Sequence, residues 1–189
     1  MKKRIAVLAS GSGSNAENIA NYFSNHELIE VSLFISNKKD AFIHRRAEKL
    51  NIPCYYFPTK QFNETDDVSG LLKKERIDLI VLAGFLLKIP ENMLRAFPDA
   101  IINIHPALLP KFGGKGMYGD HVHRAVVAAG EEQSGITVHY VNENYDEGKI
   151  IFQATCEILP GDTPEDVARK VHALEYKHFP CVIEKVLNA

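Results

Sequence analysis

Cysteine is scarce in this sequence of 189 residues, and its few cysteines are widely separated. Cys54, Cys156 and Cys181 are odd in number and form no C-x-x-C pair. They therefore suggest neither the disulfide framework of small secreted proteins nor a zinc site. This pattern predicts a protein of a reducing compartment.

Long apolar runs and an excess of positive charge are also absent. No apolar stretch approaches the ~20 residues that span a bilayer, and the run at residues 5–9 is shorter than the ~7–15 residues of a signal peptide. The net charge of −2 and the pI near 6.4 do not provide the dense positive surface that binds nucleic acid. We therefore expect a soluble, cytoplasmic protein that binds neither nucleic acid nor membranes.

Continuous apolar segments recur along the first half of the chain, at residues 5–9, 31–35, 79–83 and 100–104, with a shorter one at 54–57. Such segments are typical of strands buried on both faces of a parallel sheet. Segments with helical spacing lie between them, at residues 15–22, 41–50, 68–75 and 91–96. This alternation predicts an α/β fold, doubly wound around a mostly parallel sheet.

The chain changes character after Pro110. Residues 111–120 contain several glycines and no apolar run, which is typical of a lid or of a wall of a site. A helix is expected at 121–129, followed by strands at 135–140 and 149–157. A final helix begins near Thr163, a plausible N-cap that precedes Pro164. No linker separates these segments, so we expect one domain over residues 1–189.

A glycine-rich turn, Ser10-Gly11-Ser12-Gly13-Ser14-Asn15, joins the first predicted strand to the first predicted helix. Backbone N–H groups and a helix N-terminus converge there, as in phosphate sites, although a tight turn alone also explains the glycines. The polar side chains favour binding. No acidic residue follows the second strand to hold a ribose, so the turn favours a monophosphate over NAD.

Asn103 and His105 lie at the end of the predicted strand 100–104. Strand side chains alternate, so both should point the same way, at the sheet edge where ligands bind. An amide and an imidazolium can stabilise a developing oxyanion. An imidazolium needs a carboxylate partner. Asp146 is a candidate, although its polar loop also fits an ordinary turn between strands.

Other polar residues give no independent signal of function. His121 and His123 have no acidic or cysteine partner to complete a metal site, so a lid or a polar face is the more natural interpretation. His139 lies in an alternating strand and could face either side. Glu175 borders the apolar stripe of the last helix, which predicts a solvated carboxylate.

Four motifs together indicate a family. They are the glycine-rich turn at residues 10–15, Ala83-Gly84-Phe85, the segment 103–111 that starts Asn103-Ile104-His105-Pro106, and residues 135–139 followed by Asp146-Glu147-Gly148. In this order they closely resemble the folate-dependent phosphoribosylglycinamide formyltransferases. The resemblance covers essentially the whole chain. It implies a Rossmann-like formyltransferase fold with antiparallel C-terminal strands and a long final helix.

The resemblance also implies an activity. It predicts transfer of a formyl group from 10-formyltetrahydrofolate to the amino group of glycinamide ribonucleotide, in purine biosynthesis, with no metal. The N-terminal half would bind the ribonucleotide phosphate and the C-terminal half the folate, in a monomer or a homodimer. By position, the catalytic residues are Asn103, His105 and Asp146; the ribonucleotide contacts are Gly13, Ser14, Asn15 and Glu175; the folate contacts are Leu86, Leu87, Lys88, Ile89, Asn103, Asn142, Glu143, Asn144, Tyr145 and Asp146.

Two departures from the family pattern affect details. The loop 113–120 is longer than in many relatives, and residues 61–64 lack an arginine that meets the folate in some of them; Lys60 is a possible substitute. Two alternatives stay open. The chain could formylate an aminoacylated tRNA or an amino sugar, or hydrolyse the folate, although such relatives usually carry a further domain. It could also be a non-catalytic nucleotide-binding module, which would leave Asn103, His105 and Asp146 unexplained.

Overall fold

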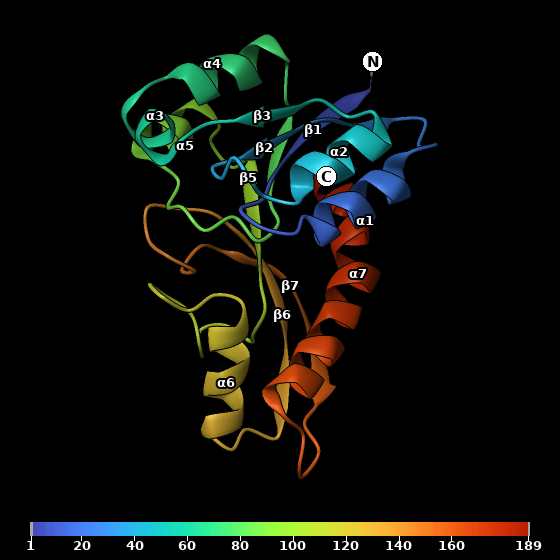
Figure 1. The fold of residues 1–189 in the computed structure, drawn as a ribbon, viewed down its shortest axis with the longest axis vertical. Helices are drawn as coiled ribbons and strands as arrows, with labels where there is room; N and C mark the ends of the chain where they lie inside the picture. The colour runs from blue at the N-terminus through green and yellow to red at the C-terminus, as the bar shows by residue number, and fades with distance from the viewer. Residues whose placement is uncertain (1, 189) are drawn as a thin grey trace.

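The computed structural model describes residues 2–188 and contains one seven-stranded sheet with helices on both faces (Figure 1). The strand order is β3-β2-β1-β4-β5-β6-β7. Strands β1 to β5 run parallel, and β6 and β7 are antiparallel to their neighbours. The predicted fold class is confirmed. The strands are β1 (Lys3–Leu8), β2 (Ile29–Ser36), β3 (Cys54–Tyr56), β4 (Leu79–Leu82), β5 (Ile101–His105), β6 (Gln133–Tyr140) and β7 (Ile150–Glu157).

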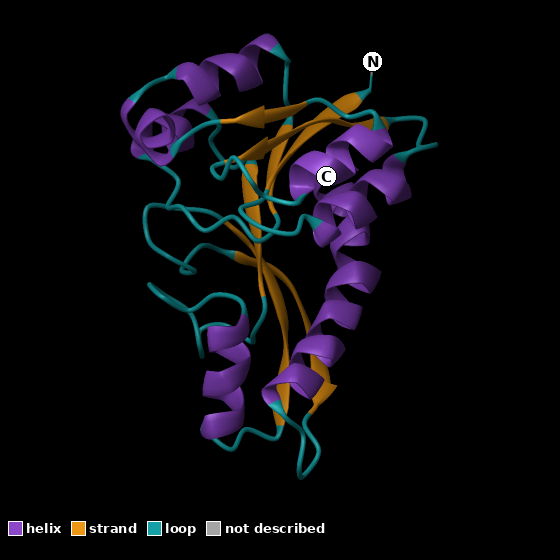
Figure 2. Ribbon diagram, in the orientation of Figure 1, coloured by secondary structure: helices purple, strands orange, loops and turns teal. Residues whose placement is uncertain are grey.

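The helices form two layers, as the purple elements of Figure 2 show. Helices α1, α2 and α7 contribute buried side chains to one core, and α3, α4 and α5 contribute to the other. Helix α6 packs with α7 beside the antiparallel strands β6 and β7 (Figure 1). The helices are α1 (Ser14–Phe23), α2 (Ile43–Leu50), α3 (Thr59–Glu64), α4 (Asp67–Lys74), α5 (Glu91–Ala96), α6 (Asp120–Ala128) and α7 (Pro164–Asn188).

Strand β1 shows why the apolar runs are uninterrupted. Ile5 and Val7 pack into the core formed with α1, α2 and α7, whereas Ala6 and Leu8 pack into the core formed with α3, α4 and α5. All four side chains are completely buried. Successive strand residues point to opposite faces, so a sheet that is covered on both sides requires apolar residues at every position.

The sequence-based element ends agree with the structure to within two residues. One helix was missed. Helix α3 follows Pro58 and contains only one buried residue, Phe62, so it offers no apolar repeat to detect. Short helices of this kind form because tertiary packing favours them and not because of a sequence period.

The order of the strands creates a crevice beside β1. This strand pairs with β2 on one side and with β4 on the other, so the connections that leave β1 and β4 diverge to opposite faces of the sheet. Ligands of open α/β folds bind outside the carboxyl ends of the strands at such a reversal. The glycine-rich turn, the segment after β4 and the end of β5 all lie at this edge.

The close packing of α2 against the glycine-rich turn gives a test of stability. Gly13 has a positive φ of 70°, and a Cβ atom there would lie 2.7 Å from the Ile43 Cβ. We expect Gly13→Ala to lower the free energy of unfolding by about 2 kcal/mol, because backbone strain and steric overlap add. Gly11→Ala is the control, since its Cβ would meet no atom within 4 Å. Equal losses for the two variants in urea unfolding would contradict this account of the turn.

Candidate active site

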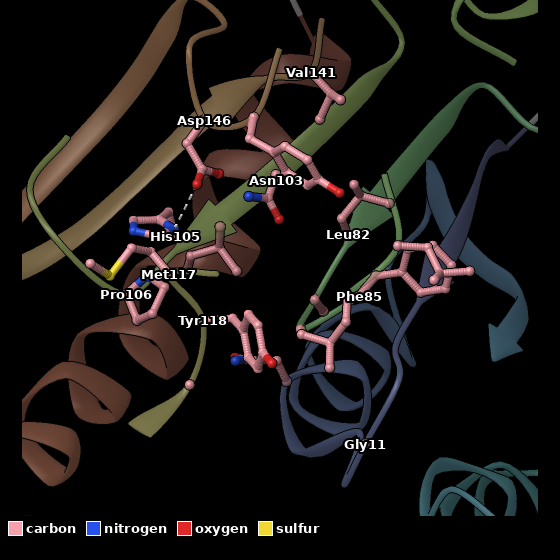
Figure 3. Close-up of a pocket in the computed structure, with 18 of the residues that line it drawn as sticks. Gly11, Leu82, Phe85, Asn103, His105, Pro106, Met117, Tyr118, Val141 and Asp146 are labelled. Atoms are coloured by element: carbon pink, nitrogen blue, oxygen red, sulfur yellow. Dashed lines mark ion pairs between the residues drawn. The ribbon is translucent and has the colours of Figure 1, made fainter. Parts of the chain in front are cut away.

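A cleft of about 520 Å³ lies at the carboxyl edge of the parallel strands (Figure 3). Five parts of the chain contribute most of its lining: the glycine-rich turn, the segment after β4, the end of β5, the loop at residues 114–120 and the loop at residues 141–146. The residues predicted as catalytic and most of those predicted as binding residues therefore share one cavity, although they come from both halves of the sequence.

The glycine-rich turn forms one end of the cleft. Helix α1 begins at Ser14, and its N-cap residue Gly13 provides no side-chain cap. The first backbone N–H groups of a helix lack partners within the helix, and together with the helix dipole they favour an anion. Arg46 of α2 supports the turn, since its Nε donates to the Ser12 carbonyl (2.8 Å) and its guanidinium pairs with Glu17.

Glu175 of α7 reaches this end of the cleft, and its sequence-based interpretation as a solvated carboxylate was wrong. The residue is only 5% exposed. Its Oε2 accepts from the Asn15 amide (2.9 Å) and from His172 Nδ1 (2.8 Å). The hydrogen bond to Glu175 raises the pKa of His172, despite partial burial that lowers it. Glu175 therefore accepts two hydrogen bonds beside the start of α1.

Asn103 and His105 project from β5 into the centre of the cleft, as the alternation of the strand predicts (Figure 3). His105 is buried, and both of its ring nitrogens face acceptors. Nε2 donates to the Phe112 carbonyl (2.8 Å), and Nδ1 lies 3.6 Å from Asp146 Oδ2. Burial lowers the pKa of His105, whereas the charge of Asp146 and the Phe112 carbonyl act in the opposite direction; the net shift is downward.

Asp146 approaches His105 from the loop between β6 and β7 (Figure 3). Its backbone adopts the left-handed conformation (φ 58°), which a short polar residue tolerates. Burial raises the pKa of Asp146. The contacts with His139 and His105 and the hydrogen bond from the Gly114 N–H (2.9 Å) lower this pKa by more than burial raises it. The net shift is downward, so Asp146 is a carboxylate at neutral pH.

His139 is the residue that sequence reasoning missed. Strand β6 pairs with β5 so that His139 lies directly opposite Asn103. His139 Nδ1 donates to the Tyr140 carbonyl (2.8 Å), and its Nε2 lies 3.1 Å from the side-chain amide nitrogen of Asn103. Nε2 is also 3.6 Å from Asp146 Oδ1. His139 thus orients Asn103 and neighbours Asp146, an arrangement that only the strand register reveals.

The segments predicted to hold the folate lie at the other end of the cleft. Residues 86–89, after β4, line it, as do Asn142, Asn144 and Tyr145. Glu143 is exposed and lies outside the lining residues, and Lys60 is exposed on α3. Residues 114–120 form a wall of the cleft, as expected for the glycine-rich loop. The expected polar face of α6 is half correct: His121 is exposed, but His123 is 2% exposed.

Residues 2–188 contain neither a candidate metal site nor a candidate membrane-spanning helix. No group of three or more His, Cys, Asp or Glu side chains in this range is arranged to hold a metal ion. No helix in the same range is sufficiently long and apolar to cross a membrane.

Comparison with known sequences identifies relatives over most of the chain. Residues 3–183 match the family described as "Formyl transferase". The chloroplastic phosphoribosylglycinamide formyltransferase of Arabidopsis thaliana is 41% identical in an alignment of 188 residues that covers 96% of this chain and 64% of the relative. The phosphoribosylglycinamide formyltransferase of Haemophilus influenzae is 38% identical over 96% of this chain and 86% of the relative. The chain thus spans slightly less than two thirds of the Arabidopsis relative.

Solved structures show the same fold. The glycinamide ribonucleotide transformylase 1 of Geobacillus kaustophilus has a TM-score of 0.90 at 33% identity, covering 99% of this chain and 100% of the other. The phosphoribosylglycinamide formyltransferase of Anaplasma phagocytophilum has a TM-score of 0.89 at 34% identity, covering 97% and 86%.

The electrostatics of the cleft can be tested without a substrate. Asp146→Asn should lower the pKa of His105 further, because it removes the charge that opposes the effect of burial. The pKa is measurable by NMR titration of the imidazole nitrogens. Asp120→Asn is the control, since Asp120 acts on His123 and His172. A pKa of His105 that rises, or stays unchanged, in Asp146→Asn would contradict the pairing of these two residues.

Proposed function

The chain belongs to the formyl transferase family, and we propose that it transfers the formyl group of 10-formyltetrahydrofolate to the amino group of glycinamide ribonucleotide. One observation carries this proposal: Asn103, His105 and Asp146 converge in a cleft whose far end is an uncapped helix N-terminus. The choice of substrate is supported by relatives that are named phosphoribosylglycinamide formyltransferases.

The ribonucleotide fits the end of the cleft formed by α1. Gly13, Ser14 and Asn15 would hold the phosphate through backbone N–H groups and short polar side chains, without a metal. Glu175 lies beside Asn15, and its carboxyl oxygens can accept hydrogen bonds, so it suits the amino or hydroxyl groups of the substrate. The buried Asn15 Oδ1 has no partner among the described residues and offers one more acceptor.

The reduced folate fits the opposite end. Leu86, Leu87 and Ile89 with Val141 provide apolar surface for a flat ring, and Lys88 belongs to the same segment. The loop 142–146 supplies amide and backbone groups that can hydrogen-bond a pterin edge. Glu143 is exposed and does not line the cleft, so we assign its side chain no direct role in binding. These segments flank Asn103, which places the catalytic groups between the two ligands.

The folate would supply the formyl carbon, which the substrate amine attacks. A carbon–nitrogen bond forms, the bond to the folate nitrogen breaks, and one proton passes from the amine to that nitrogen. The Asn103 amide, oriented by His139, donates to the formyl oxygen as negative charge develops there. That charge also raises the proton affinity of His105, which Asp146 supports. Asp146 would further organise a water for the proton transfer.

The loop at residues 111–119 must move during this reaction. In the structure the Phe112 carbonyl accepts a hydrogen bond from His105 Nε2, and the Gly114 N–H donates one to Asp146 Oδ2. The Nε2 proton can reach a formyl oxygen only when the Phe112 carbonyl withdraws. We therefore assign residues 111–119 the role of a lid that exchanges its own hydrogen bonds with those of the substrates.

We propose a single domain, with phosphate binding in its N-terminal half and folate binding in its C-terminal half, that acts as a monomer or a homodimer in the cytoplasm. The Arabidopsis relative is named as chloroplastic, so membership of the family does not by itself fix the compartment. Only the two small molecules are required as partners.

The catalytic roles predict a separation of turnover from binding. His105→Ala and Asp146→Asn should each lower kcat by about 10²–10³, the size expected for a lost transition-state contact. The Kd of glycinamide ribonucleotide should change only a few-fold. Absorbance of the folate product gives kcat, and calorimetry gives Kd. Glu147→Gln is the matched control, because it removes a carboxylate on the same loop outside the cleft lining. Near wild-type turnover in either variant would refute the assignment.

The phosphate site predicts a second result. Glycinamide riboside, which lacks the phosphate, should have a KM about 100-fold higher than the ribonucleotide, because at least two charge-assisted hydrogen bonds are lost. Initial rates with both amines measure this ratio. If the two KM values are similar, the turn at residues 13–15 does not bind the phosphate, whatever the fate of the catalytic residues.

A further inference from the structure

Ser10 lies where the glycine-rich turn meets the connection that leaves β4. It is the first residue of that turn, two positions after the end of β1, and it is 2% exposed. Its backbone N–H donates to the Gly84 carbonyl (3.0 Å), in the connection that leaves β4. The residue therefore spans the reversal of strand order, where the chain from β1 and the chain from β4 separate.

The hydroxyl of Ser10 makes two more hydrogen bonds across this junction. It donates to Asn37 Oδ1 (2.6 Å), at the end of β2, and it accepts from the Leu86 N–H (2.9 Å). An amide oxygen can only accept, so this assignment fixes the direction of both bonds. One buried hydroxyl thus ties the connections after β1, β2 and β4 to one another.

Leu86 begins the segment 86–89 that we assign to the folate. On the outer side, the preceding residue Phe85 is buried and packs on Phe62, with ring centroids 5.0 Å apart. Gly84 has a positive φ of 75°, so the chain turns sharply just before this segment. On the inner side, the Ser10 hydroxyl accepts from the Leu86 N–H, and this bond adds to the one between the Ser10 N–H and the Gly84 carbonyl.

We propose that Ser10 is a positioning residue that sets the folate segment 86–89 relative to the phosphate turn 11–15. This inference rests on the proposed function, because it takes segment 86–89 as part of the folate site. Removing the hydroxyl leaves the Leu86 N–H and Asn37 Oδ1 without their partner, and a segment with unpaired polar groups shifts until water or another group satisfies them. The phosphate turn keeps its own support from α2.

Ser36 provides a matched control at the same edge of the sheet. Its side chain is also completely buried, and its hydroxyl accepts from the Lys38 N–H (3.2 Å) within its own turn. Ser36→Ala therefore removes a buried hydroxyl next to Asn37 and leaves the hydrogen bond between Ser10 and the Leu86 N–H in place. Any effect of Ser10→Ala that Ser36→Ala does not reproduce belongs to the link and not to general loss of stability.

The experiment measures two ligands separately by calorimetry, with tetrahydrofolate as the folate probe and ribose 5-phosphate as the phosphate probe. In Ser10→Ala the Kd of tetrahydrofolate should rise about tenfold, the size of one buried hydrogen bond, while the Kd of ribose 5-phosphate stays within about twofold. In Ser36→Ala both values should stay within about twofold, even if the melting temperature falls as much as in Ser10→Ala.

Several outcomes would overturn the inference. Equal Kd values of tetrahydrofolate in the two variants would reduce Ser10 to a structural residue, and a parallel loss of both ligands in Ser10→Ala would indicate general damage to the cleft. If Ser10→Ala does not fold, Asn37→Ala replaces it, since it weakens the same junction; an unchanged Kd of tetrahydrofolate there would also refute the role. Wild-type protein that does not bind tetrahydrofolate would refute the proposed function itself, a result distinct from failure of Ser10 alone.

Discussion

The cleft depends on one topological constraint, the position of β1 between β2 and β4. The chain reverses its direction of winding there, so the connections after β1 and β4 lead to opposite layers and leave a crevice at the sheet edge. The uncapped start of α1 opens into this crevice. Strand β5 lies next to β4 in the sheet and carries Asn103 and His105 at the same edge. The same reversal therefore brings the uncapped start of α1 and this polar pair to one edge of the sheet.

Electrostatics in the centre of the cleft reflect a balance between burial and charge. Three buried or half-buried groups, His105, His139 and Asp146, share a small volume, and only the carboxylate carries a charge whatever the state of the rings. Burial favours neutral imidazole, and the carboxylate favours imidazolium. A site balanced in this way responds strongly to any new charge that a substrate brings, which is a useful property for groups that must stabilise charge only transiently.

The sequence predicted the strands and most helices because burial on two faces imposes an uninterrupted apolar pattern, as in residues 5–8 of β1. It also predicted Asn103 and His105, since alternation along one strand fixes their common direction. It failed where the information is not local. Glu175 is buried because α7 crosses the turn at Asn15, and His139 faces Asn103 because of the antiparallel register of β5 and β6. The choice of Asp146 rested mainly on family resemblance, since its local sequence resembles an ordinary turn.

The contacts of the glycine-rich loop have a consequence for affinity. Phe112 and Gly114 satisfy the same atoms of His105 and Asp146 that would serve the reaction, so this part of the chain is an internal competitor tethered next to the site. A tethered competitor has a high effective concentration, and the apparent affinity of a ligand falls by the fraction of molecules in which the loop is bound. Under the proposed function, the same competition would speed release of the product, because the returning loop would replace the product's hydrogen bonds.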